Sequence, residues 1–416
     1  MLDLVLVYMR TGLMLPAHTV TYVVRADIVK ITDIWADNGC RYDTGVMIAM
    51  EYVKLTAEQR VLAEEIHREA IVIDGHSDIL KAVADGKMRL GDRVEVPAEE
   101  GWEAPVGMAV DSLAEMYGFS PHTSYFETMG FYDIPRFLEG GLTAQGMAIY
   151  LSTHELDRAL QRALDMVYWL YEDAAVNEQF EIVTTVEQIR AVKAAGKTSG
   201  FLTFEGFEPL GYDLKLLDIF ARLGLRMGSL THSRRNAFAD GGGQIGDPPT
   251  GGLTDLGRAA VKRMNELGIV IDLGHMNLRG SWEIIERSDA PVVLSHARSS
   301  TLQRVQAWHE QDLQSNRHLW EAIAKSGGLV GVIGYSQKTL EEYVDNIDEM
   351  VAAIGIDHVG LGTDFFGYLH SPVGFQGMHE LPNVTAELVR RGYGREDILA
   401  ILGGNWLRVF EVVWGR

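Results

Sequence analysis

Two side chains that can bind a metal ion, those of His76 and Asp78, follow closely on the apolar run at residues 71–73. Residues i and i+2 of an extended backbone project to the same side, so this imidazole and this carboxylate can converge on one point. Such a pair suits a divalent metal ion at the end of a strand. A histidine and an aspartate at this spacing also occur by chance, but at least five later apolar runs of the chain also end in His, Asp or Glu.

Short apolar runs alternate with helical segments from residue 71 onward. Seven further runs follow the first, at residues 143–151, 200–205, 227–232, 269–275, 291–296, 328–335 and 358–364. Between them, the segments 212–223, 253–267, 317–325 and 340–354 have helical patterns, and Gly224 and Gly268 are placed to end the first two. Eight such units in about 340 residues predict an α/β fold, a (β/α)8 TIM-type barrel, rather than an open doubly wound sheet.

The carboxyl ends of the strands carry the catalytic groups in a barrel of this kind. Packing of a core does not explain polar residues at so many equivalent positions. In chain order these residues are His76, Asp78, Gln145, Glu205, His232, His275, His296, Tyr335 and Asp364. Any one of the histidines could be a hydrogen-bonded structural residue, but as a group five of these residues are predicted to be metal ligands: His76, Asp78, Glu205, His275 and His296.

The number of ligands suggests two metal ions. Three imidazoles and two carboxylates exceed what one tetrahedral zinc ion needs while leaving a position open for water. A second ion requires a bridging carboxylate, for which Glu205 is the natural candidate, and a hydroxide held between two cations is a strong nucleophile at neutral pH. Asp364 is placed to take a proton from that water, although an aspartate there could instead cap a helix or a turn. His232 could donate to an oxyanion.

The composition is that of an ordinary globular protein, with 47% hydrophobic and 23% charged residues. The 58 acidic and 37 basic residues leave a net charge of −21, which argues against nucleic acid or an anionic membrane as a partner. Cys40 is the only cysteine, so an internal disulfide is impossible. The apolar runs are far shorter than a membrane span, and residues 4–8 make a poor signal peptide, so we expect a cytoplasmic protein.

Two regions stand outside the repeating pattern. Residues 1–50 are predicted to be an N-terminal extension, either a small β-structure or a leader added by an upstream start codon, ahead of a catalytic barrel at residues 51–416. A helix is expected at residues 55–70, with Thr56 as its cap. A long insertion at about residues 81–140 follows the first strand and is rich in glycine, proline, methionine and aromatic residues. This insertion could cover the pocket or pack against neighbouring loops.

A set of longer motifs resembles the membrane (renal) dipeptidase family of the amidohydrolase superfamily. The resemblance runs from about residue 55 to residue 410. The matching pieces are Ile-Asp-Gly-His-Ser-Asp at 73–78, Glu-Gly at 205–206, Leu-Gly-Leu-Arg-Met-Gly-Ser-Leu-Thr-His at 223–232, Asn236, Gly-Leu-Thr-Asp-Leu-Gly at 252–257, Met-Asn-Glu-Leu-Gly-Ile-Val-Ile-Asp-Leu-Gly-His at 264–275, Pro-Val-Val-Leu-Ser-His at 291–296, Asp-His-Val-Gly-Leu-Gly-Thr-Asp-Phe at 357–365 and Gly-Gly-Asn-Trp-Leu-Arg-Val-Phe at 403–410. In this order and spacing they are highly specific.

The resemblance implies a barrel of the metal-dependent hydrolase kind with two zinc ions. It implies that His76 and Asp78 bind one ion, that His275 and His296 bind the other, and that Glu205 bridges them. It further implies His232 as a transition-state contact and Asp364 as the acid/base.

For the substrate, the resemblance implies that Arg317 holds a terminal carboxylate through two parallel hydrogen bonds, although Arg317 could also be a surface helix residue. It places Tyr335 near a tyrosine that contacts the substrate. Two departures leave the preferred substrate open. The chain has Phe366 where the family has a second aspartate after the last strand, and Gly274 where the family has a serine before the histidine.

We therefore expect a zinc-dependent dipeptidase that hydrolyses short peptides, including those with a C-terminal D-residue. The alternatives are a related di-zinc hydrolase acting on another amide or a lactone, and a catalytically silent barrel that serves as an interaction module. Family resemblance alone also implies a homodimer.

Overall fold

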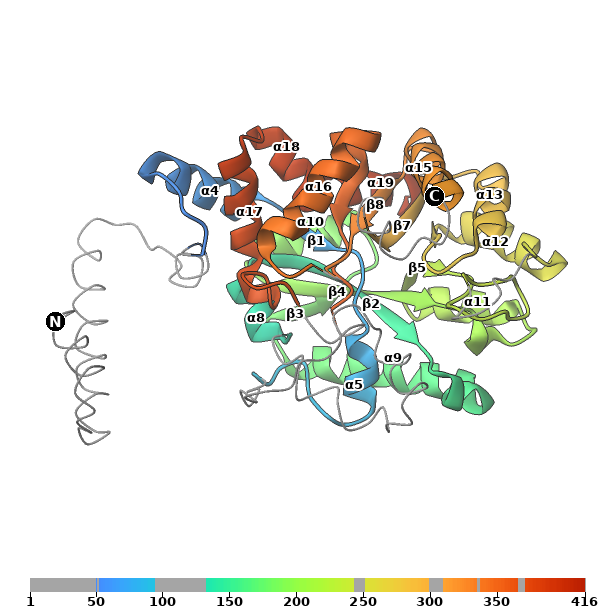
Figure 1. Ribbon diagram of the computed structural model, residues 1–416. Helices are drawn as coiled ribbons and strands as arrows, with labels where there is room; N and C mark the ends of the chain where they lie inside the picture. The colour runs from blue at the N-terminus through green and yellow to red at the C-terminus, as the bar shows by residue number, and fades with distance from the viewer. Residues whose placement is uncertain are drawn as a thin grey trace, which may run out of the picture. The chain divides into compact units, whose positions relative to one another are not determined.

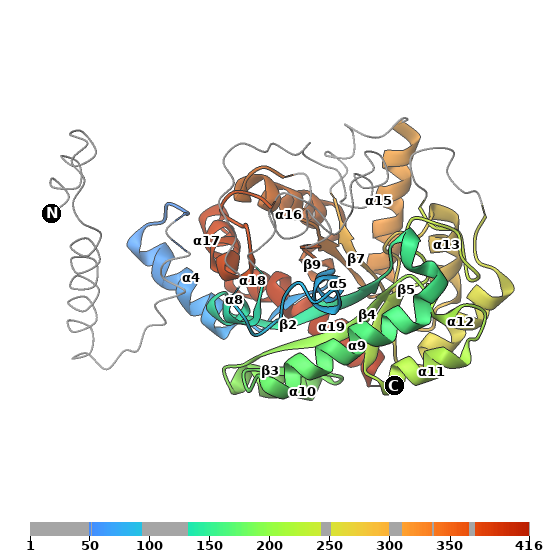
Figure 2. The ribbon, with the colours of Figure 1, turned by 90° about the horizontal axis from the view of Figure 1, so that it is seen from below.

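Parallel strands form the centre of the molecule in a computed structural model, which describes residues 50, 52–93, 132–242, 251–298, 310–334, 337–365 and 371–415, with side chains from residue 316 onward in the fifth range. The sheet runs in the order β2-β1-β9-β8-β7-β6-β5-β4 and closes because β2 also pairs with β4, where Tyr150 lies beside Glu205. Its eight strands are β1 (Val72–Asp74), β2 (Leu142–Tyr150), β4 (Thr198–Glu205), β5 (Leu225–Ser229), β6 (Val270–Asp272), β7 (Val292–Ala297), β8 (Leu329–Val332) and β9 (Val359–Leu361). The predicted (β/α)8 barrel is confirmed, and Figure 2 shows the strands inside a ring of helices.

Most helices lie between successive strands, α4 precedes the first strand, α17 to α19 follow the last, and the helices surround the sheet (Figure 1). The α-helices are α4 (Ala57–Glu69), α5 (Ile79–Ala84), α8 (Ile134–Glu139), α9 (Ala159–Val176), α10 (Val186–Ala194), α11 (Lys215–Arg222), α12 (Asp255–Leu267), α13 (Leu278–Arg287), α15 (Glu310–Lys325), α16 (Leu340–Ile354), α17 (Leu381–Arg391), α18 (Arg395–Leu399) and α19 (Asn405–Trp414). Shorter 3₁₀ turns lie at Thr153–Arg158, Glu208–Leu210, Ile356–His358 and Met378–Glu380, and a π-helical turn at Ala400–Gly404 precedes α19. No helix of the described residues combines the length and the apolar character needed to cross a membrane.

Local signals in the sequence mark where helices begin and end. The Thr56 hydroxyl accepts the backbone N–H of Gln59, and the Gln59 side chain completes a capping box at the start of α4. Thr254 accepts the N–H of Gly257 at the start of α12. Gly268 ends that helix in the left-handed conformation at φ 66°, which glycine adopts without steric cost.

One strand was not expected from the sequence. β3 (Phe180–Ile182) pairs with β4 only, so it extends the sheet beyond the closed barrel. It lies between α9 and α10, in the connection from β2 to β4. With three residues, this run is too short for its periodicity to distinguish it from a loop.

The C-terminal helix α19 packs against the barrel. Its residues Trp406 and Phe410 are fully buried and belong to one apolar cluster with strand residues that include Ile73 and Phe201. The Trp406 indole N–H donates to the Leu361 carbonyl over 2.9 Å. Gly75 lies against the same ring, because a Cβ there would be 2.2 Å from an indole carbon. This contact holds the turn that leads to His76.

The predicted N-terminal extension, residues 1–50, lies outside the described residues except for Met50. Of the predicted insertion, the structure describes the two ends. At one end α5 follows β1, and at the other α8 precedes β2. Residues 94–131, between these ends, lie outside the described residues.

Candidate metal centre

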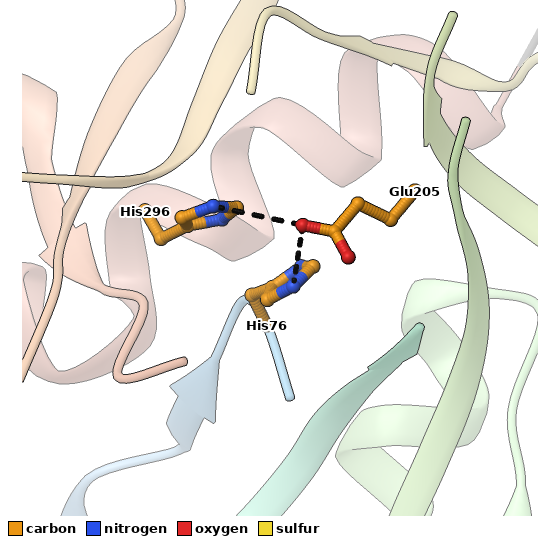
Figure 3. A group of neighbouring side chains, drawn as sticks. All are labelled: His76, Glu205 and His296. Carbon is orange, nitrogen blue, oxygen red and sulfur yellow. Dashed lines mark ion pairs between the residues drawn. The ribbon is translucent and has the colours of Figure 1, made fainter. Parts of the chain in front are cut away.

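Glu205, the last residue of β4, is buried at the centre of a group of imidazoles, of which His76 and His296 are buried and His275 is partly exposed. Its Oε1 lies 2.8 Å from Nε2 of His275, 3.4 Å from Nε2 of His76 and 3.8 Å from Nε2 of His296. Figure 3 shows this carboxylate directed toward the rings of His76 and His296, which come from other strands of the barrel. The Nε2 atoms of His275 and His296 are 2.9 Å apart. Residues far apart in the sequence are thus assembled at one end of the barrel.

Two further carboxylates lie near the same nitrogen of His76. Its Nε2 is 3.6 Å from Oδ1 of Asp364 and 3.8 Å from Oδ1 of Asp78. The possible ligand atoms fall into three overlapping groups, each within 4.8 Å: His76, Glu205 and His296; Glu205, His232 and His275; and His76, Asp78 and Asp364. Because Glu205 and His76 are each shared by two groups, the geometry can accommodate more than one cation.

Several polar atoms of this cluster lack a hydrogen-bond partner. Nε2 of His76, Oδ1 of Asp78 and Oε2 of Glu205 are buried, and no group in the described part of the chain hydrogen-bonds to them. A buried polar atom left in this state costs free energy, so native proteins rarely keep three in one place. Nitrogen and carboxylate donors directed at one point fit a divalent transition metal.

The charges of the site also favour a cation. Burial raises the pKa of Asp364 to about 7, and the nearby Glu205 carboxylate adds to this effect. Burial alone would lower the pKa of His76, but Glu205 and Asp364 raise it to about 10. Glu205 in turn has a pKa well below its usual range, because His76 and His275 outweigh the effect of burial. In the metal-free chain, protons on imidazoles thus supply the positive charge that a metal ion would bring.

Two of the candidate residues adopt a strained backbone conformation. His275 and Asp364 have φ angles of 59° and 58°, and these are the non-glycine residues with positive φ in the described parts of the chain. Each lies three residues beyond the last residue of its strand, β6 or β9. Residues in this conformation gather at functional sites, where the surrounding structure supports the strain.

Asp74, at the end of β1, binds Thr363, the residue immediately before Asp364. Its carboxylate accepts the backbone N–H and the hydroxyl of Thr363, both over 2.7 Å, and the amide of Gln145 over 3.0 Å. The backbone N–H of Asp364 donates to the His76 carbonyl over 3.1 Å. The sequence analysis missed the roles of Asp74 and Thr363. The signal available was a buried aspartate two residues before His76, and a hydroxyl residue immediately before Asp364.

His232 extends the site toward β2. The centroid of its ring is 4.0 Å from that of His275, on which it stacks, and 4.7 Å from that of Tyr150. The Ser233 hydroxyl lies 2.8 Å from Nδ1 of His232, and burial lowers the pKa of this imidazole well below its usual range. Lys81 is 5.2 Å from the Tyr150 ring centroid. Sequence reasoning missed Tyr150, although it is the residue that pairs with Glu205 in the sheet.

The predicted substrate contacts are not among the clustered residues. Arg317 is on α15 with 57% of its side chain exposed, and its Nε is 3.4 Å from Oε1 of Glu321, one helical turn away. Tyr335 and Phe366 lie outside the described residues. The structure thus brings together His76, Asp78, Glu205, His232, His275, His296 and Asp364, and it pairs Arg317 with a surface carboxylate.

Comparison with known proteins identifies the family of this chain. Residues 60–414 match the family model described as membrane dipeptidase, peptidase family M19. Dipeptidase aclJ of Aspergillus oryzae is 28% identical over 311 residues, 69% of this chain and 71% of that protein. Dipeptidase 3 of Rattus norvegicus is 27% identical over 297 residues, 69% of this chain and 59% of that protein.

A solved structure shares the fold as well. It is a metallo peptidase from Rhodobacter sphaeroides, liganded with a phosphinate mimic of the dipeptide L-Ala-D-Ala. It is 25% identical, with a TM-score of 0.66, and the match covers 83% of this chain and 100% of that one. The family match over most of the chain, the fold and the clustered donors lead to one conclusion: this chain belongs to the membrane dipeptidase family, peptidase family M19, and is a metallo-dipeptidase.

Proposed function

We propose that this protein is a zinc-dependent dipeptidase with two zinc ions, and that its substrates include dipeptides with a C-terminal D-residue. The observation that carries the proposal is the position of Glu205, whose Oε1 lies within 3.8 Å of three imidazole nitrogens while its buried Oε2 has no partner among the described residues. The D-residue rests on the Rhodobacter sphaeroides relative, whose ligand mimics L-Ala-D-Ala.

The ligands divide into two sets around Glu205. His76 and Asp78 would hold one ion, and His275 and His296, whose Nε2 atoms are 2.9 Å apart, would hold the other. Imidazole and carboxylate ligands suit zinc, which tolerates the mixed set and leaves a coordination position open. Zinc, when bound, supplies Lewis acidity that activates water and polarises a carbonyl. Glu205 would lie between the two sets.

Asp364 would transfer the proton from the attacking water to the leaving amine. It lies beside His76, with its Oδ1 3.6 Å from Nε2 of that ring, and a carboxylate in such a position can accept and release a proton. Its strained backbone at φ 58° directs it from the loop after β9.

His232 would stabilise the oxyanion of the tetrahedral stage. Burial keeps its imidazole neutral, so it needs a fixed tautomer to act as a donor. If the Ser233 hydroxyl donates to Nδ1 over 2.8 Å, the proton of His232 lies on Nε2 and is available to the substrate. Stacking on His275 at 4.0 Å keeps that ring beside the metal ligands.

The substrate's carboxylate requires a cationic partner, and Arg317 stays our prediction for it. Its guanidinium is mostly exposed and contacts Glu321, so it must leave this surface pair to bind a peptide. An exposed pair of this kind contributes less than about 1 kcal/mol, so the exchange is energetically accessible. Arg317→Ala should raise KM for dipeptides and leave the metal content unchanged.

The proposal is tested on one purified preparation by counting metal and assaying a panel of L,L and L,D dipeptides. We expect two zinc ions per chain and hydrolysis that is lost in Asp364→Asn at full metal content. Asp255→Asn, which changes a carboxylate that is 98% exposed, serves as the control and should remain active. Two zinc ions without dipeptide turnover would redirect the search to other amides or lactones. Absence of zinc after reconstitution would refute the ligand assignment.

A further inference from the structure

A chain of buried hydrogen bonds leads from β6 to one of the proposed zinc ligands. Asp272 ends β6, and its Oδ2 accepts the hydroxyl of Ser295 over 2.6 Å. The same hydroxyl oxygen lies 2.8 Å from Nδ1 of His296. Relative exposure is 3% for Asp272, 0% for Ser295 and 8% for His296, so water does not compete for these contacts.

The proton positions along this chain follow from the donors that Asp272 already binds. Its Oδ1 accepts the backbone N–H of Ser295 over 2.8 Å and that of Gly274 over 2.9 Å. With acceptor contacts at both oxygens, the carboxylate takes the single proton of the Ser295 hydroxyl. The hydroxyl oxygen then has only lone pairs to offer His296, so Nδ1 must carry the proton and Nε2 must carry the lone pair.

We infer that Asp272 and Ser295 are positioning residues that hold His296 as the Nδ1–H tautomer, with Nε2 ready to bind metal. This inference rests on the proposed zinc centre. A partner on the second nitrogen of a ligating histidine fixes its ring orientation and increases its basicity. Here the partner is a serine hydroxyl polarised by a carboxylate.

The same pair of hydrogen bonds to a strand-terminal aspartate recurs beside Asp364. β1 and β6 both consist of Val-Ile-Asp, and each terminal aspartate accepts the N–H and the hydroxyl of a residue on a neighbouring segment. Asp74 accepts from Thr363, which precedes Asp364, and Asp272 accepts from Ser295, which precedes His296. In both cases the aspartate fixes the residue immediately before a group of the site.

Gly274 leaves room for this arrangement. A Cβ built at this position would lie 3.1 Å from Oδ2 of Asp272, the oxygen that accepts the Ser295 hydroxyl. This is tighter than an ordinary contact, so a side chain at this position would require the Asp272 carboxylate to shift by a few tenths of an ångström. Glycine at position 274, where the family has a serine, leaves that carboxylate in place against Ser295.

Two substitutions separate the roles of the carboxylate and the hydroxyl. Ser295→Ala removes the partner of Nδ1 and leaves the ring free to choose its tautomer. Asp272→Asn places an amide N–H₂ against the Ser295 oxygen, so the serine proton turns toward His296. Nδ1 then becomes the acceptor, the proton moves to Nε2, and that nitrogen can no longer bind metal. The second change should therefore be the more damaging one.

The matched control is Ser199→Ala. Ser199 is equally buried in β4, and its hydroxyl donates to the Thr143 carbonyl over 2.7 Å. It lies six residues before Glu205, about 20 Å along the strand, so its loss should not reach the metal ligands. Both serine variants remove one buried hydroxyl, and only Ser295→Ala removes it from an imidazole.

The first measurement is the affinity of each protein for zinc alone, by competition with a chromophoric chelator. We expect the more weakly bound ion of Ser295→Ala to lose about 10- to 100-fold in affinity. The loss in Asp272→Asn should be larger, and Ser199→Ala should bind zinc as the unmodified chain does. Equal zinc affinities in all four proteins would overturn the inference while leaving the proposed zinc centre intact.

The second measurement is made on the unmodified protein and needs one variant only for the assignment. Nitrogen-15 NMR of the metal-free, unmodified protein distinguishes the two histidine tautomers, and His296→Gln identifies the resonance. We expect His296 to carry its proton on Nδ1. A proton on Nε2 would overturn the inference directly. If the chain bound no zinc at all, the proposed function would fail, and the tautomer would still test the hydrogen-bond chain.

Discussion

Mild acid should destabilise the folded protein through His67, which lies in the last turn of α4 and is not one of the candidate metal ligands. The side chain is 1% exposed and bound on both sides of its ring. Its Nε2 lies 2.9 Å from the Gly140 carbonyl, which can only accept, so this nitrogen carries the proton. Nδ1 then accepts the Thr385 hydroxyl over 2.7 Å. The folded chain therefore holds a neutral imidazole.

Burial lowers the pKa of His67 from 6.5 to about 4, and the Gly140 carbonyl offsets only part of this effect. Between these two values the unfolded chain binds a proton that the folded chain does not. The free energy of unfolding therefore decreases as the pH falls from 6.5 to 4 and is unaffected by this group above that range. The full loss is about 3 kcal/mol, of which about 2 kcal/mol has occurred by pH 5.

The measurement is urea unfolding at pH 7.5 and pH 5 for the unmodified protein and for His67→Gln. Glutamine cannot titrate, so the variant lacks this contribution, while the other titrating groups act on both proteins alike. We expect the unmodified protein to lose about 2 kcal/mol more than the variant between the two pH values. Equal losses in the two proteins would refute the assignment of a buried, neutral His67.

Three further perturbations test the structure that supports the site. Gly75→Ala places a Cβ 2.2 Å from the Trp406 ring and should lower the free energy of unfolding by about 2–3 kcal/mol, measured by thermal unfolding. Gly86→Ala, at φ 68° with open space around it, should lower it by about 1 kcal/mol, and equal losses would contradict the steric argument. Asp74→Asn directs an amide N–H₂ at the Thr363 hydroxyl, which donates to this carboxylate in the unmodified chain. The change should lower the free energy of unfolding in urea by about 1–3 kcal/mol and reduce kcat. Removal of metal by a chelator should abolish dipeptide hydrolysis and lower the midpoint of thermal unfolding. Zinc added at about 1,000 times its Kd should raise the free energy of unfolding by about 4 kcal/mol. Full activity and an unchanged midpoint after metal removal would contradict the proposed centre.

Much of the barrel was predictable because its signals are local. Each strand is a short apolar run, and Thr56, Thr254 and Gly268 mark helix ends by chemistry that acts within a few residues. The candidate ligands were predictable for a similar reason. Parallel strands bring their carboxyl ends together, so Glu205 and His296 could be grouped without knowledge of the tertiary contacts.

The rest depends on contacts between distant segments. Asp74 and Thr363 are 289 residues apart. The predicted barrel makes their strands neighbours, but no local pattern reports that these two side chains form a hydrogen bond. His275 and Asp364 reach the site from loops with left-handed backbone, which a strand-end argument does not describe. For Arg317 the sequence offered two readings, a substrate contact or a surface helix residue. Its exposed pair with Glu321 is what a surface residue would show before substrate binds.

The left-handed backbone at His275 and Asp364 sets these two positions apart for laboratory evolution. An L-residue with a side chain in this conformation costs about 1 kcal/mol or more, and glycine would avoid that cost. A library of the metal-free protein screened only for heat resistance should therefore accumulate glycine or asparagine at these positions, where the gain in stability coincides with the loss of a proposed ligand or acid/base. A library selected for peptide hydrolysis should retain histidine and aspartate. The two screens would thus diverge first at residues 275 and 364.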